Sequence, residues 1–215
     1  MLHIRKAMNI MDSYTDETGL PVASELEKNI DLDFDGFEEE NAQLTKQYEL
    51  TRGSLIALIK LYTAGSEING KLIQAGGDPD ALDMRYRREY DALKSLDNMV
   101  QLAEEHHVYS GTGTFDPSDV TTDGVFRTPA FMSMSISLKV AVKTTNYRRQ
   151  DDEDHVIHTI LPKGFTNGFY VAPYSHDPEE LEFLIMPNVE FDFVSTRKLD
   201  LGGVTRHIHS YRARR

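Results

Sequence analysis

The spacing of apolar residues changes near Val108, and this change constrains the fold more than any other feature of the sequence. Before it, apolar residues recur at helical spacing over 55–62 and 86–103, with Thr51 or Ser54 and Asp78 to Asp80 as helix starts. After it come short apolar runs separated by glycine and proline, which predict strands over 130–135, 155–161, 169–171, 180–186, 190–195 and 205–211, with a short helix over 137–145. We expect an α+β fold in which N-terminal helices lead into a mostly antiparallel β-core.

Charge divides the chain into an arm and a domain. The protein has 215 residues and a formal net charge of −12, and its first fifty residues hold twelve acids against four bases. Such a segment repels itself and is poor in core-forming residues. We therefore expect a flexible acidic arm over 1–45 and a folded domain over 46–215. An acidic surface does not favour nucleic acid as a partner, so a protein is the expected macromolecular substrate.

Composition also limits the chemistry and the location. Cysteine is absent, which excludes disulfides, a thiol nucleophile and thiolate metal ligands. The apolar runs are far shorter than the roughly 18 residues of a membrane span, and the basic start is followed by acids instead of the apolar core of a secretory signal. We expect a soluble, cytoplasmic protein that does not interact with membranes.

Two glutamates, Glu180 and Glu182, stand at the start of the apolar run 183–186. On a strand their side chains would share one face. Two carboxylates this close repel, so one can accept a proton near neutral pH while the other remains a fixed negative charge for a cationic transition state. A solvated acidic turn before a strand is the alternative interpretation.

Several motifs precede this pair in a recognisable order. They are Tyr62-Thr63 and Ile68-Asn69 within 61–72, Ser133 and Ser135 in a Ser-x-Ser pattern, and the segment 155–171. In order and spacing the chain resembles the ADP-ribosyltransferase exoenzyme family, the Arg/Ser/Glu class of bacterial toxins and phage-injected enzymes. The resemblance extends from Ser54 to Leu199.

The resemblance implies a mono-ADP-ribosyltransferase that moves ADP-ribose from NAD to an arginine of a target protein and releases nicotinamide. It places Glu182 at the ribosyl cation, with Ser133 orienting it and Ser135 in the cofactor site. It makes Glu180 the base that an arginine acceptor needs, because a protonated guanidinium cannot attack. It also makes the turn that carries Tyr174 and His176 the substrate-recognising loop.

One motif departs from the family pattern. The family has an arginine followed by glycine at the end of a strand, and the arginine holds the NAD phosphates; here Ser110 and Gly111 stand in these positions. A hydroxyl does not replace a bidentate charged contact. We expect another cation to serve, with Arg127, Arg148 and Arg149 as the candidates. An inactivated protein is the alternative.

The histidines raise the question of a metal. His155 with His158, and His207 with His209, could suggest ligands; the latter two are two residues apart and would share a face on a strand. No carboxylate or third histidine is clearly in register with either pair, so we expect no metal. The sequence thus predicts an NAD-dependent protein-arginine ADP-ribosyltransferase that acts inside a host or target cell as a phage-encoded or delivered effector. An NAD glycohydrolase and a non-catalytic binding module of the same fold remain alternatives.

Overall fold

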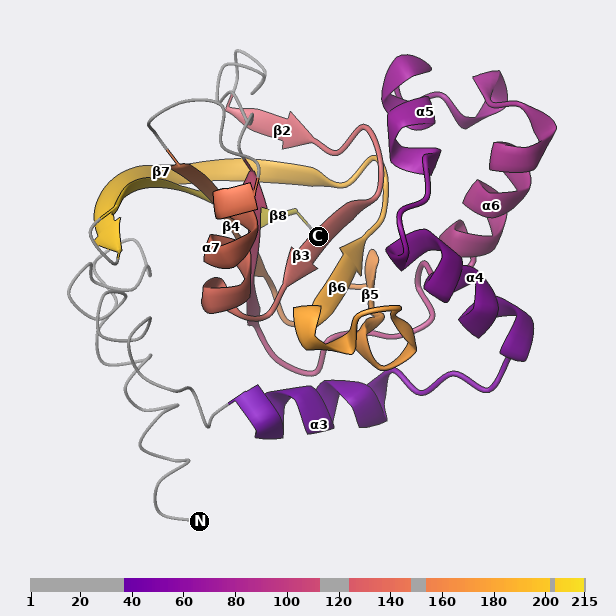
Figure 1. Cartoon of the computed structure of the whole chain (residues 1–215), viewed down its shortest axis with the longest axis horizontal. Helices are drawn as coiled ribbons and strands as arrows, with labels where there is room; N and C mark the ends of the chain where they lie inside the picture. Colours follow the sequence, from indigo (N-terminus) through magenta and orange to yellow (C-terminus); the bar gives the residue numbers. More distant parts are fainter. Residues whose placement is uncertain (1–36, 113–123, 148–153, 202–203, 215) are drawn as a thin grey trace.

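The computed structural model describes residues 37–112, 124–147, 154–201 and 204–214. A twisted sheet lies at the centre of this part of the chain, with helices on both sides (Figure 1). Helices α4 (Gly53–Thr63), α5 (Ile68–Gln74) and α6 (Met84–Lys94) gather on one side, and α7 (Leu138–Tyr147) lies on the other. The α+β prediction is confirmed.

The sheet has eight strands in the order β2-β7-β8-β4-β1-β3-β6-β5. All its pairings are antiparallel except the parallel pair β4–β8. The strands are β1 (His106–Thr112), β2 (Val125–Arg127), β3 (Met132–Ser135), β4 (Asp154–Leu161), β5 (Gly168–Tyr170), β6 (Glu182–Ile185), β7 (Glu190–Leu201) and β8 (Val204–Ala213). The six strands predicted from the sequence all form, while β7 and β8 extend beyond their predicted bounds.

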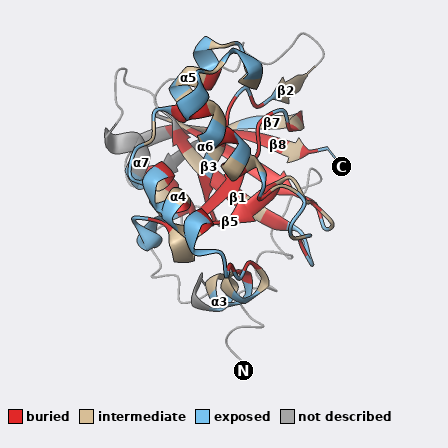
Figure 2. Ribbon diagram, turned by 90° about the vertical axis from the view of Figure 1, so that its right-hand side faces the viewer, coloured by how far each residue is buried: buried red, intermediate tan, exposed pale blue. Residues whose placement is uncertain are grey.

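Strand β6 lies in the core and is buried on both faces. Figure 2 shows the buried strands beneath helices whose outer sides are exposed. The ring of Tyr48 meets the rings of Phe169 and Phe183 edge-on, with centroids 4.9 and 5.8 Å apart. This arrangement favours the electrostatics of aromatic pairs. These ring contacts hold Phe183, the residue after Glu182, in the middle of the core.

Two predicted helix starts are wrong. Arg52 is the N-cap of α4, and neither Thr51 nor Ser54 caps it. Helix α6 is capped by Asp83, whose Oδ1 accepts hydrogen bonds from the backbone N–H groups of Arg85 and Tyr86. Residues 79–81 form a separate 3₁₀ turn, η1 (Pro79–Ala81), and α6 ends at Lys94 instead of continuing to residue 103.

Helix α3 (Phe37–Gln47) crosses the boundary predicted at residue 45. Leu44 is buried, the Glu40 carboxylate lies 2.8 Å from Nδ1 of His106, and the Tyr170 hydroxyl donates to Oδ1 of Asn41 at 2.7 Å. The folded domain therefore begins before residue 46, and the rest of the predicted arm, residues 1–36, lies outside the described residues. None of the described helices is long and apolar enough to cross a membrane.

Six of the eight histidines lie on the neighbouring strands β1, β4 and β8. On one face, Nδ1 of His107 lies 2.9 Å from Nε2 of His158, and Nδ1 of His158 lies 3.1 Å from the Ser210 hydroxyl. Burial lowers the pKa of His158 well below its usual 6.5. A second group has three members, so the expectation that no third histidine is in register is wrong: His155 of β4 is in register with His207 of β8. Nδ1 of His155 lies 2.9 Å from Nε2 of His209, and burial lowers the pKa of His209 to about 4.

Within the described ranges, no group of three or more histidine, aspartate or glutamate side chains is placed to hold a metal ion. Imidazole pairs that share hydrogen bonds need at least one neutral ring as acceptor. The His107–His158 contact links β1 to β4, and the His155–His209 contact links β4 to β8.

The His158 pair should make the fold sensitive to acid. Because its pKa is lower in the folded state, the unfolded chain takes up a proton first as the pH falls below about 6.5, and stability is lost. We expect His158→Gln to lose less free energy of unfolding between pH 7.5 and 5.5 than the unmutated protein, by on the order of 1 kcal/mol.

Urea unfolding at the two pH values measures this difference. The matched control is His176→Gln, a substitution at an exposed histidine, which should keep the pH dependence of the unmutated protein. The same loss of stability in His158→Gln and in the unmutated protein would show that His158 is not the responsive group.

Candidate active site

Glu182 is the first residue of β6 and is only 4% exposed. Across the sheet it is in register with Ser135 of β3, and its carboxyl group makes a hydrogen bond with the Ser133 hydroxyl. Burial raises the pKa of Glu182 to about 7; the Ser133 bond lowers it, and the charge of Glu180 raises it. A carboxyl group of this kind can change its charge near neutral pH, which is typical of functional sites.

Glu180 does not share a strand with Glu182. It ends a 3₁₀ turn, η4 (Pro178–Glu180), and is exposed. Leu181 then adopts a left-handed conformation with φ 50°, and β6 starts after it. The predicted common strand face is therefore wrong, although the charge of Glu180 still acts on Glu182. The outcome is two neighbouring carboxyl groups in unlike environments, which allows them different roles.

The helical layer supplies a partner for Ser133. The Tyr62 hydroxyl of α4 lies 3.1 Å from Oγ of Ser133, and Nδ2 of Asn69 on α5 donates to the same hydroxyl at 3.0 Å. Burial and the charge of Glu182 both raise the pKa of Tyr62, so its phenol is neutral. In the sequence, Tyr62 and Asn69 belong to a motif to which no role was assigned. The presence of that motif was the only sequence signal for this part of the site.

Ser135 lies beside this group and shapes the backbone. It is buried, and its hydroxyl accepts a hydrogen bond from the backbone N–H of Ser137 at 3.0 Å, just before α7 begins. On its other side it is in register with Tyr109 of β1. Ser135 therefore links the candidate site to α7, and a contact with a cofactor remains a prediction.

The predicted cofactor contacts fall in different places. Ser110 and Gly111 lie on β1 opposite Ile157 and Val156, and Ser110 is half-buried. Arg127 lies on β2, which is the edge strand at the far end of the strand order from β6. Arg148 and Arg149 lie outside the described residues.

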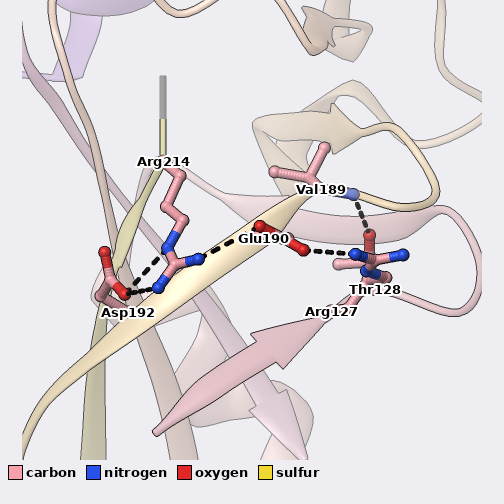
Figure 3. A network of polar contacts seen from close by, with 6 residues as sticks. All are labelled: Arg127, Thr128, Val189, Glu190, Asp192 and Arg214. Atoms are coloured by element: carbon pink, nitrogen blue, oxygen red, sulfur yellow. Dashed lines mark hydrogen bonds and ion pairs between the residues drawn. The ribbon is translucent and has the colours of Figure 1, made fainter. Parts of the chain in front are cut away.

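Arg127 is already part of a polar network (Figure 3). Its guanidinium forms an ion pair with Glu190, and Arg214 reaches both Glu190 at 3.2 Å and Asp192 at 2.7 Å. The paired guanidinium groups lower the pKa of Glu190. The structure thus ties Arg127 to β7 and does not bring it next to Glu182.

The turn before β6 holds the two predicted recognition residues differently. The Tyr174 hydroxyl accepts from the backbone N–H of Leu50 at 2.5 Å and donates to the carbonyl of Tyr48 at 3.2 Å. Tyr174 therefore anchors the turn to the segment between α3 and α4. His176 is exposed, while its backbone N–H donates to Oγ1 of Thr63 at 2.7 Å. Of the two, His176 has the side chain available to a partner.

The fold is similar to that of several solved ADP-ribosyltransferases. C3stau2 from S. aureus, solved with NAD, is 17% identical with a TM-score of 0.68, covering 85% of this chain and 96% of its own. Plx2a, an ADP-ribosyltransferase toxin from Paenibacillus larvae, is 19% identical with a TM-score of 0.64, covering 83% and 96%. The ADP-ribosyltransferase Vis, solved with agmatine, is 14% identical with a TM-score of 0.62, covering 91% and 87%.

No protein-family model and no curated protein sequence matches the chain. At these identities the likeness concerns the fold. The chain has the fold of the ADP-ribosyltransferase toxins, as the sequence motifs predicted.

The raised pKa of Glu182 should cost stability at alkaline pH. The folded state keeps its proton up to pH 7, whereas the unfolded carboxyl loses it near 4.5, so stability falls as the pH rises between these values. This difference corresponds to roughly 3 kcal/mol. We expect Glu182→Gln to be more stable than the unmutated protein at pH 8, with most of the gain absent at pH 5.

Thermal and urea unfolding at the two pH values test this expectation. Glu179→Gln removes an exposed carboxyl group from the same turn and is the matched control, for which no such gain is expected. A Glu182→Gln variant that is less stable than the unmutated protein at pH 8 would contradict a buried, desolvated Glu182.

Proposed function

We propose that the protein is a mono-ADP-ribosyltransferase that transfers ADP-ribose from NAD to an arginine of a target protein and releases nicotinamide. The observation that carries this proposal is the buried Glu182, held by a serine hydroxyl on the neighbouring strand of an ADP-ribosyltransferase-like sheet. C3stau2 was solved with NAD, which supports NAD as the substrate here.

Glu182 would act on the charge that develops when the nicotinamide bond breaks. The ribosyl group becomes an oxocarbenium ion, so a fixed carboxylate stabilises the transition state more than the ground state. The burial of Glu182 strengthens this interaction, because few water molecules screen it. The ionised form is the active one, and a cationic nicotinamide ring nearby favours that form.

Glu180 would serve the acceptor. An arginine side chain attacks only after losing a proton, and Glu180 is exposed directly before Leu181 and Glu182. The neighbour Vis was solved with agmatine, which carries the same guanidinium group as arginine, and this supports a guanidinium acceptor. His176, exposed in the same turn, would contact the target protein inside the host or target cell.

The phosphates of NAD need hydrogen-bond donors or cations in addition to the two glutamates. We assign this role to Ser110, Gly111 and Ser135 with a cation from Arg148 or Arg149; Arg127 would first have to leave Glu190. Exposed ion pairs of this type contribute about 0–1 kcal/mol, so the ion pair is a small obstacle. The larger one is that Arg127 lies on β2, at the opposite end of the strand order from β6.

Two other functions are consistent with the same fold. In an NAD glycohydrolase, water would replace the arginine. In a binding module turnover would be lost, and the observation in favour is Ser110 in place of a charged phosphate ligand.

Substitution of Glu182 and substitution of Glu180 should affect nicotinamide release and transfer differently. Glu182→Gln should lower both nicotinamide release and transfer by on the order of a hundredfold or more, because it removes a preorganised charge. Glu180→Gln should suppress transfer to an arginine acceptor and keep part of the release into water, since only the acceptor needs a base.

Nicotinamide release measured with and without agmatine, and with target-cell lysate plus labelled NAD, tests this division. Glu179→Gln is the control for a lost charge in the turn. Equal effects of both substitutions on both activities would refute the division of roles. Release that is independent of any acceptor would indicate a glycohydrolase, and NAD binding without release would indicate a binding module.

A further inference from the structure

The last turn of α4 reaches both glutamates by separate routes. Tyr62 contacts Ser133, which in turn bonds Glu182. Its neighbour Thr63 accepts a hydrogen bond from the backbone N–H of His176, in the turn that carries Glu180. Two consecutive residues of one helix thus connect to the two carboxyl groups that the proposed function requires.

The chemistry of the groups fixes the direction of the hydrogen bonds on the Tyr62 side. An amide nitrogen only donates, so Asn69 donates to the Tyr62 hydroxyl. In the ionised form that the reaction requires, the Glu182 carboxylate only accepts, so the Ser133 hydroxyl donates its proton to it. The single Tyr62 proton is then left for Ser133. The polarity runs from Asn69 through Tyr62 and Ser133 to Glu182, and each donor strengthens the next.

The helical layer holds this chain in place. The turn between α4 and α5 is fixed to α6, because the Ser66 hydroxyl bonds Glu89 and the Tyr86 hydroxyl donates to Glu67 at 2.6 Å. Ile68 beside Asn69 is fully buried. The position of Tyr62 is therefore determined by three helices before any ligand binds.

The Thr63 side acts on the backbone. Its hydroxyl donates to the carbonyl of Ile59 at 3.0 Å and uses its lone pair for His176 at 2.7 Å. From there the turn continues through Asp177, whose N–H donates to Oγ of Ser175 at 3.1 Å and whose carbonyl accepts from the N–H of Glu180 at 3.3 Å. Thr63 thus sets where the backbone of the Glu180 turn begins.

We propose that Tyr62 and Thr63 are positioning residues for two different steps: Tyr62 orients Glu182 for cleavage of the nicotinamide bond, and Thr63 holds the Glu180 turn for the acceptor. This inference rests on the proposed function. It predicts that substitutions at Tyr62 and Thr63 have different effects on nicotinamide release and on transfer to the acceptor.

Tyr62→Phe should lower kcat for nicotinamide release about tenfold with little change in KM for NAD, and should lower transfer by the same factor. It should also move the pH profile of kcat/KM to higher pH, because a weaker donor stabilises the carboxylate less. Thr63→Val should lower transfer to agmatine about tenfold more than it lowers release into water, and Thr63→Ser should restore transfer.

Tyr90→Phe is the matched control for loss of a buried phenol. Tyr90 lies on α6 and packs on the Phe131 ring, as Tyr62 does. The distance between ring centroids is 5.6 Å for Tyr90 and 6.0 Å for Tyr62. It should change neither the pH profile nor the ratio of the activities. Should Tyr62→Phe not fold, Asn69→Ala removes the first donor of the chain and should shift the profile in the same direction.

Equal losses of both activities in Tyr62→Phe and Thr63→Val, or an unchanged pH profile in Tyr62→Phe, would overturn the inference. If the unmutated protein neither releases nicotinamide nor transfers, the proposed function fails, and the positions can still be tested by NMR. The Glu182 carboxyl should then titrate at higher pH in Tyr62→Phe, and the His176 amide should exchange faster in Thr63→Val. An unchanged Glu182 titration in Tyr62→Phe together with an unchanged His176 exchange rate in Thr63→Val would overturn the inference, whatever the activity of the protein.

Discussion

Burial of one carboxyl group at the start of β6 is the constraint on which the rest of the site depends. A desolvated carboxylate is unfavourable unless hydroxyl or amide groups compensate for lost water. Ser133 supplies that compensation from β3, and the Tyr62 hydroxyl supports Ser133 from α4. The helical layer is therefore required by the electrostatics of the strand as well as by the packing of apolar side chains.

The sequence was most informative where the pattern was local. The run 155–161 is rich in the β-branched residues that favour strands, which identified β4, and the breaks at glycine and proline located β5 and β6. Helix α3 was missed because few of its residues are apolar, and its attachment depends on single contacts such as Leu44 in the core and Glu40 with His106. Tertiary contacts of this kind leave no periodic signal.

The site was predicted in its residues and less well in its geometry. Glu182 and Ser133 could be named from motifs, but the shared face of Glu180 and Glu182 failed because Leu181 takes a left-handed conformation that leucine rarely adopts. The bond between Tyr62 and Ser133 joins positions 71 residues apart. The ion pair that occupies Arg127 likewise depends on a partner from a distant strand, 63 residues away. No spacing rule in a single sequence reveals either contact.

The parallel pair β4–β8 affects how the molecule can assemble. Strand β8 lies between β7 and β4, so the part of the sheet with β2 and β7 joins the part with β4, β1 and β3 only through residues 204–213. During synthesis, the ribosome must release this strand before the sheet becomes continuous. Until then β4 exposes an unpaired edge, which other chains could pair with. Pairing between segments that are distant in the sequence is slow compared with helix formation, so β4 would keep this edge unpaired after the helices have formed, and the chain would be most prone to aggregate in that interval.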